Sequence, residues 1–167
     1  MNAFAKVAMQ PVVLRTCKGT VNGTDFEAGR VELSEATYPP PHGEAHVMLA
    51  TQRAPAPDYT TKELKISFSK NKDNGSYGLF ADAYTVRVLY IDSTVPAKPV
   101  VYTQYQGIAR VEYDNSTATF SGTISAALEN WDENIRKTVS IKVDFEANPA
   151  VRIRRNPRRP SSPAARC

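Results

Sequence analysis

The chain has 167 residues, the size of a single domain that can bury a core without disulfide bonds. Its two cysteines, Cys17 and Cys167, are too few and too far apart for a disulfide framework or a CxxC metal cluster. Six of the 21 basic residues are arginines in residues 149–167, a segment without acids, which leaves 15 basic against 17 acidic residues elsewhere. Electrostatic binding of nucleic acid or anionic lipid is therefore expected of this tail alone.

The composition divides the chain into three parts. Residues 1–10 form an N-terminal arm before Pro11, residues 11–148 form the domain, and residues 149–167 form a basic tail with too few large apolar groups to order itself. The arm is a poor signal peptide, and no apolar run reaches the length of a membrane helix. The sequence thus leaves the localisation undetermined.

The first half of the domain reads as a series of short strands. A β-branched run at residues 12–17 is followed by Asn22 and Gly23, a strong signal for a tight hairpin turn. Alternation at residues 31–34 predicts another strand, which the three prolines at positions 39–41 must end. Beyond them, residues 45, 47 and 49 are expected on one face of a strand and residues 42, 44, 46 and 48 on the other.

The second half continues the period-2 pattern. Residues 64–69 alternate, and a turn at residues 71–75 is expected to join them to one long strand over residues 76–92. The apolar phase changes inside this run, which we interpret as a β-bulge near residues 80–83. A strand at residues 100–113 has a possible bend at Gly107. Residues 117–147 then predict a long antiparallel hairpin with even positions buried in its first strand and odd positions in its second.

These elements predict an all-β fold. Eight or nine strands separated by turns, with no 3.6-residue period and no internal repeat, are typical of an antiparallel β-sandwich or flattened barrel, here followed by a flexible basic C-terminal tail. No protein family can be named from such a pattern, because alternating strands and Asn-Gly turns occur in many unrelated folds.

One short pattern could hold a metal ion. His42, Glu44 and His46 alternate along a predicted strand, and two imidazoles with a carboxylate suit first-row metals. Alternate strand residues are about 7 Å apart, however, so the three can meet at one ion only if the strand bends after Pro41. The favoured interpretation is a polar, solvent-facing edge after a proline turn.

Nothing in the sequence specifies an enzyme. There is no GxSxG motif and no phosphate-binding glycine loop, and the acidic residues are scattered singly along strand faces. We therefore expect no catalytic residues and no cofactor, and a non-enzymatic role is favoured.

Aromatic residues offer a partner-binding surface. Tyr84 and Tyr102 lie among the tyrosines of the central strands, where outward-facing rings would form a platform, although core packing would explain most of them. Trp131 falls in the predicted hairpin connection. It could be an exposed anchor, but a position folded back as a lid on the core is favoured.

The tail and the long hairpin suggest two further modes of binding. A polyanion could bind the tail arginines without sequence specificity, through Arg152, Arg154, Arg155, Arg158 and Arg159. The hairpin at residues 117–147 has the strand length and alternation of a membrane-inserting hairpin, but a soluble sheet predicts the same pattern, so membrane insertion is a minor hypothesis.

The sequence favours a non-catalytic binding or structural β-domain. A protein partner, or another copy of the chain, is expected to contact its loops and exposed strand edges. Nucleic acid is an alternative partner through the tail, and a membrane is the least favoured one.

Overall fold

The computed structural model describes residues 15–149. They form ten antiparallel strands and one 3-10 turn, η1, and among them there is no helix long and apolar enough to cross a membrane. The strands are β1 (Arg15–Val21), β2 (Thr24–Glu27), β3 (Arg30–Thr37), β4 (Glu44–Arg53), β5 (Thr61–Ser69), β6 (Gly75–Gly78), β7 (Val86–Asp92), β8 (Val100–Asp114), β9 (Thr119–Asn130) and β10 (Lys137–Ala147), with η1 at Asp132–Asn134. The predicted all-β antiparallel fold is confirmed.

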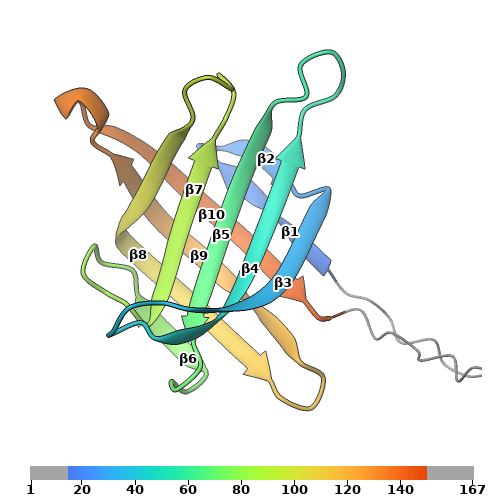
Figure 1. Cartoon of the computed structure of the whole chain (residues 1–167), viewed down its shortest axis with the longest axis vertical. Helices are drawn as coiled ribbons and strands as arrows, with labels where there is room; N and C mark the ends of the chain where they lie inside the picture. Colours follow the sequence, from blue (N-terminus) through green and yellow to red (C-terminus); the bar gives the residue numbers. More distant parts are fainter. Residues whose placement is uncertain (1–14, 150–167) are drawn as a thin grey trace, which may run out of the picture.

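Nine of the strands follow one another in a single sheet, in the order β2-β1-β10-β9-β8-β7-β5-β4-β3, and β6 pairs with β8 beside this path. The two edge strands, β2 and β3, are consecutive in the chain and are joined by only two residues. Ala28 N donates to Cys17 O of β1 at 2.9 Å, and Gly29 N donates to Thr51 O of β4 at 3.0 Å. Because this link is bonded to both ends of the path, the sheet must curl back on itself, and it forms the half-barrel seen in Figure 1.

Two of the predicted hairpins are present as expected, whereas the turn at residues 71–75 leads from β5 into β6, which pairs with β8 and not with β5. Asn22 and Gly23 both have positive φ, 50° and 74°, as a tight turn of the type I′ kind requires between β1 and β2. In the long hairpin, β9 pairs with β10 from Asn130 opposite Lys137 to Phe120 opposite Ala147. Its even positions in β9 and odd positions in β10 face the core, as the alternation predicted.

The core fills the concave side of the curled sheet. Phe120 lies at its centre, with ring centroids 4.9 Å from Phe145 and 6.1 Å from Phe68. Aliphatic residues from β4, β5, β7 and β10 surround these rings, among them Met48, Ile66, Val88 and Ile141. Their alternation leaves the other positions of each strand on the opposite, outer face of the sheet.

The predicted single strand over residues 76–92 is wrong. The run is divided into β6, which pairs with residues 108–111 of β8, and β7, which pairs with residues 100–103 of the same strand. The β-bulge lies in β8, between Gln104 and Gln106, and not near residues 80–83. Gln104 is buried there, and its Oε1 accepts from Val88 N at 2.7 Å while its Nε2 donates to the carbonyls of Phe80, Ala83 and Val86 at 3.1–3.2 Å. One amide side chain thus supplies the hydrogen bonds that a continuous ladder would have made.

The connection between β3 and β4, residues 38–43, is called the proline loop here. It contains a cis bond between Pro40 and Pro41, and Gly43 follows at φ 65°. Tyr38 N donates to Gly43 O at 2.9 Å, which closes the loop at its base. In Figure 1 the loop crosses the ends of β4, β5 and β7 on the outer face of the sheet. This crossing builds the site described next.

Candidate functional site

A pocket of about 430 Å³ lies between the proline loop and the outer face of the sheet. Tyr38 and the three prolines line the pocket from the loop, and Tyr84 contributes a further aromatic ring. Strands β5 and β7 supply the remaining lining from their outward positions, together with one β7 backbone segment: Lys65, Ser67, Arg87, Val88 and Leu89. We call this the outer pocket. Most of its surface is aromatic or aliphatic, with a few polar groups below, which is the usual make-up of a ligand site.

His42 forms the floor of the outer pocket and is only 4% exposed. Its Nδ1 is 2.9 Å from Ser69 Oγ, and its Nε2 is 2.8 Å from Ser67 Oγ. Ser69 Oγ donates its single hydrogen to the His42 carbonyl at 2.8 Å, so it accepts from the histidine. Nδ1 therefore carries the proton, and Nε2 accepts from the Ser67 hydroxyl.

Small residues make room for this histidine. Ala45 of β4 lies opposite Ser69, and Val47 lies opposite Ser67, so the positions of β4 and β5 beside the histidine carry short side chains. Both aliphatic residues are buried there. The hydrogen bonds of His42, and not a large buried apolar side chain, therefore hold the loop against the sheet.

Burial sets the charge of the floor. The pKa of His42 lies below its ordinary value of 6.5, mainly because burial disfavours the charged imidazolium, while the nearby Tyr84 carbonyl acts in the opposite direction and Arg87 lowers the pKa further. The imidazole is neutral at pH 7. The floor is thus uncharged, and both of its ring nitrogens are already hydrogen-bonded.

Two cations stand above this floor, each against a tyrosine ring. Lys65 Nζ is 5.5 Å from the Tyr38 ring centroid, and Arg87 Cζ is 5.1 Å from the Tyr84 ring centroid. Arg87 Nη1 donates to the carbonyls of Ala81 and Ala83 at 2.9 and 3.0 Å. These two bonds orient the guanidinium group at the pocket.

A larger hollow of about 820 Å³ lies at the link between β2 and β3. It is lined by charges of both signs, including Glu27, Arg53 and Glu63, and by the ion pair of Arg30 with Glu32. Exposed pairs of this kind are already solvated and contribute little binding energy. The outer pocket is therefore the better candidate site.

The structure does not bring the predicted metal ligands together. His42 is in the outer pocket, whereas His46 faces the core side, where its ring stacks on Tyr113 with centroids 3.5 Å apart. Glu44 is exposed at the start of β4. Within residues 15–149 no group of three or more His, Cys, Asp or Glu side chains could hold a metal ion. The prediction of a solvent-facing edge is wrong for the two histidines, because the turn at Gly43 folds His42 onto the sheet and the strand alternation turns His46 inward, whereas Glu44 is exposed.

The three predicted partner-binding aromatics lie in different places. Tyr84 is a wall of the outer pocket. Tyr102 is in the core, with its ring centroid 6.0 Å from that of Tyr90. Trp131 is 58% exposed, so the favoured prediction of a lid on the core is wrong. Asn130 takes the last inward position of β9, and the residue after it consequently points outward.

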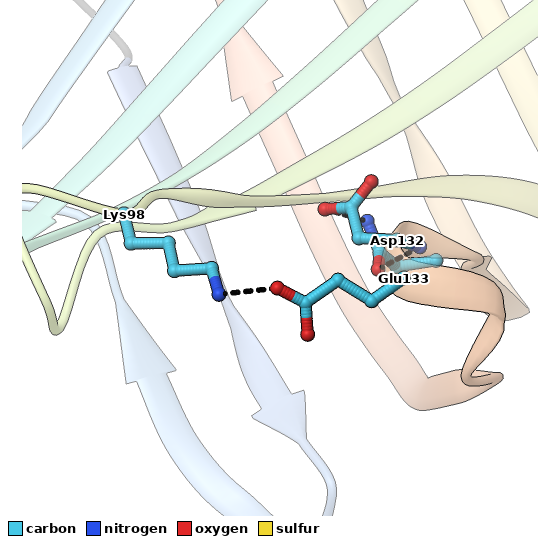
Figure 2. A network of polar contacts seen from close by, with 4 residues as sticks. Lys98, Asp132 and Glu133 are labelled. Carbon is cyan, nitrogen blue, oxygen red and sulfur yellow. Dashed lines mark hydrogen bonds and ion pairs between the residues drawn. The ribbon is translucent and has the colours of Figure 1, made fainter.

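The Trp131 connection is held by polar contacts. Asn130 Oδ1 accepts from Asp132 N at 2.9 Å, and Asn130 Nδ2 donates to Val101 O at 2.8 Å. Figure 2 shows Lys98, from the β7–β8 connection, reaching Glu133 at 2.8 Å. The two connections therefore lie side by side at this end of the sheet.

The predicted polyanion-binding arginines Arg152, Arg154, Arg155, Arg158 and Arg159 lie outside the described residues, as does the arm at residues 1–10. Their roles stay predictions. Sequence reasoning also missed Lys65, Ser67, Ser69 and Arg87 as site residues. The only signal was their alternation with buried positions, which reads as an ordinary solvated strand face.

Comparisons of the chain with protein-family models, with curated proteins and with solved structures found no match. The geometry of the outer pocket is accordingly the basis for a functional proposal.

Proposed function

We propose that this protein is a non-catalytic binding domain and that the outer pocket is its ligand site. The observation that carries the proposal is the pairing of aromatic and aliphatic walls with a floor whose histidine is fully hydrogen-bonded. A volume of about 430 Å³ lies within the range of small-molecule sites, roughly 300–1,000 Å³. The proposal keeps the expectation that a loop provides the contact, since the proline loop forms one wall.

A catalytic role is less well supported by the same geometry. The bond between Ser67 and His42 is the contact that a serine nucleophile makes with its general base. Here, however, the second ring nitrogen faces Ser69 instead of a carboxylate, and none of the described residues lining the pocket is an acid. Hydrolysis of an activated ester by the full chain, lost in Ser67→Ala, would replace the binding proposal with an esterase.

The direct test is a fragment screen followed by amide ¹H–¹⁵N NMR on the full chain. The library should hold anionic, neutral and cationic fragments with aromatic and aliphatic bodies. Bound fragments should shift amides of residues 38–43 and 84–89, and the shifts should weaken in Tyr84→Ala but not in Tyr59→Ala, which removes an exposed tyrosine outside the pocket. Shifts that cluster elsewhere, or no binding by any fragment, would refute the proposal.

Self-association through strand edges is a second proposal. Within residues 15–149, β2 pairs only with β1 and β3 pairs only with β4, so the eight-residue β3 has one edge without a strand partner. Light scattering should then show oligomers of the full chain at high concentration. A strict monomer, unchanged when residues 1–10 are removed, would remove the support.

A further inference from the structure

We infer that the outer pocket takes a small organic anion, one whose carboxylate or similar group is attached to a flat apolar body. This inference rests on the proposed function and adds the chemical class of the ligand. It is carried by the charges that line the pocket, by the free hydrogen-bond donors of one arginine and by the rings of the walls.

The charge of the lining is of one sign. Lys65 and Arg87 are the charged side chains among the described lining residues, and no aspartate or glutamate is among them. Neither cation has a carboxylate within ion-pair distance in residues 15–149, whereas Lys70, Lys98 and Arg136 each do. Lys65 and Arg87 make cation–π contacts with tyrosine rings instead. Two neighbouring cations without a counter-charge favour an anion between them.

Arg87 has hydrogen-bond donors that are available to a ligand. Its Nη1 is occupied by the carbonyls of Ala81 and Ala83, but within the described part of the chain Nε and Nη2 donate to no acceptor. These two nitrogens form the edge of the guanidinium group that matches the two oxygens of a carboxylate. The backbone contacts hold the group in place, so little side-chain freedom is lost when an anion binds.

The rest of the pocket suits an apolar body. Tyr38, Leu89 and the prolines offer rings and aliphatic surface, and the ring nitrogens of His42 are already used by Ser67 and Ser69. A ligand rich in polar groups would lose hydration there without gaining partners. A ligand with a flat ring and one anionic group could pack its ring against the apolar walls and pair its charge with Lys65 and Arg87.

Two other basic hollows of the described structure differ from the outer pocket in their lining. The hollow beside His46 contains Lys70 and Lys72, but it also contains Asp73, and Lys70 is paired with Glu35. The groove on the outer face of β8, β9 and β10 contains Arg110 and Lys142 together with Asp144, and no aromatic ring lines it. The outer pocket differs from both in combining aromatic rings and cations with a lining in which none of the described residues is acidic.

The experiment compares three probes that share one naphthalene ring: naphthoate, naphthalenemethanol and naphthylmethylammonium. Dissociation constants are measured by NMR titration of the full chain. Naphthoate should bind at least about tenfold more tightly than the neutral alcohol, because a charge-assisted hydrogen bond is worth that much or more. The ammonium probe should bind more weakly than the alcohol.

Two variants and a matched control locate the effect. Lys65→Met keeps the aliphatic stem of a side chain that makes no hydrogen bond or ion pair in the described structure, so it should fold normally and lose most of the preference for naphthoate. Arg87→Met should lose it more completely, although it also removes two backbone contacts. Lys62→Met removes a cation of the same strand outside the pocket and should leave all three affinities unchanged.

The outcomes separate the inference from the proposal beneath it. If all three probes bind the pocket alike, or the ammonium binds best, the anion inference is refuted and the binding site stands. Naphthoate binding that is unchanged in both pocket variants would also refute the inference. If no probe shifts the amides of residues 38–43 and 84–89, the proposed binding function itself fails.

Discussion

The hydrogen bonds of His42 should be among the most important side-chain contacts for the stability of this fold. The ring ties the proline loop to Ser67 and Ser69, which are 25 and 27 residues away in the sequence. In His42→Ala both bonds are lost. At this position the loop then keeps, among the described residues, only the bond from Ser69 Oγ to the backbone carbonyl of residue 42, and we expect the outer pocket to lose its floor.

The magnitude follows from the partners. Ser69 keeps the carbonyl of residue 42 as its acceptor, so losing the bond to Nδ1 should cost about 1 kcal/mol. The buried Ser67 hydroxyl has no second acceptor in the described structure, and leaving it unsatisfied should cost about 1–3 kcal/mol. The variant should therefore be destabilised by about 2–4 kcal/mol.

Urea unfolding of the full chain, followed by circular dichroism, measures this loss. With a slope of about 2 kcal/mol/M, the midpoint should fall by about 1–2 M. Tyr59→Ala, an exposed loop substitution, should change the unfolding free energy by less than about 0.5 kcal/mol and serves as the control. A double-mutant cycle with Ser67→Ala should give a coupling of about 1 kcal/mol.

The reasoning would be refuted by a midpoint of His42→Ala equal to that of the Tyr59 control. A zero coupling energy with Ser67 would show that the short distance between Nε2 and Oγ does not stabilise the loop.

Three further predictions concern pH, the buried amide and the exposed tryptophan. Burial holds the pKa of both His42 and His46 below 6.5, so the unfolded chain takes up protons at a higher pH than the folded chain does. The unfolding free energy should therefore fall as the pH drops below about 6.5, by up to about 1.4 kcal/mol per pH unit for each histidine. It should become constant below the folded pKa values. Urea midpoints that stay constant from about pH 7 to about pH 5 would contradict this. Gln104→Leu removes the partner of the Val88 N–H and of the buried Val86 carbonyl and should cost about 3–4 kcal/mol in urea unfolding. Gln106→Leu, at a more accessible glutamine of the same strand, should cost little, and equal effects of the two substitutions would disprove the role of the amide. Trp131→Ala should change the thermal midpoint by no more than a degree or two, since the ring is mostly exposed, and a large drop would show that it packs as a lid after all.

Local pattern was enough to predict much of the sheet. The alternation through residues 117–147 predicted both which positions of β9 and β10 are buried and that the two strands pair, because facing and hairpin pairing depend on neighbours in the sequence. Asn22 and Gly23 predicted their turn for the same reason, since the positive φ values belong to those residues themselves.

Pairing between distant segments was not predictable in this way. The phase change within residues 76–92 is real, but alternation shows which face a residue occupies and not which strand lies beside it. β6 and β7 pair with different parts of the long β8, and the irregularity between them is accommodated by the bulge at Gln104. That arrangement depends on contacts across the whole sheet.

The sequence by itself determined the fold class, the long hairpin and the lack of any known catalytic motif. Only the tertiary structure decided where the histidines lie and what surrounds them. His42 and His46 are four residues apart, yet the turn at Gly43 places one on the outer face and strand alternation places the other toward the core. The partners of His42 come from β5, and Arg87 comes from β7, so the outer pocket exists only once the proline loop has folded over both strands. The spacing of residues along the chain cannot predict contacts between segments this far apart in the sequence, because the curl of the sheet decides which segments meet.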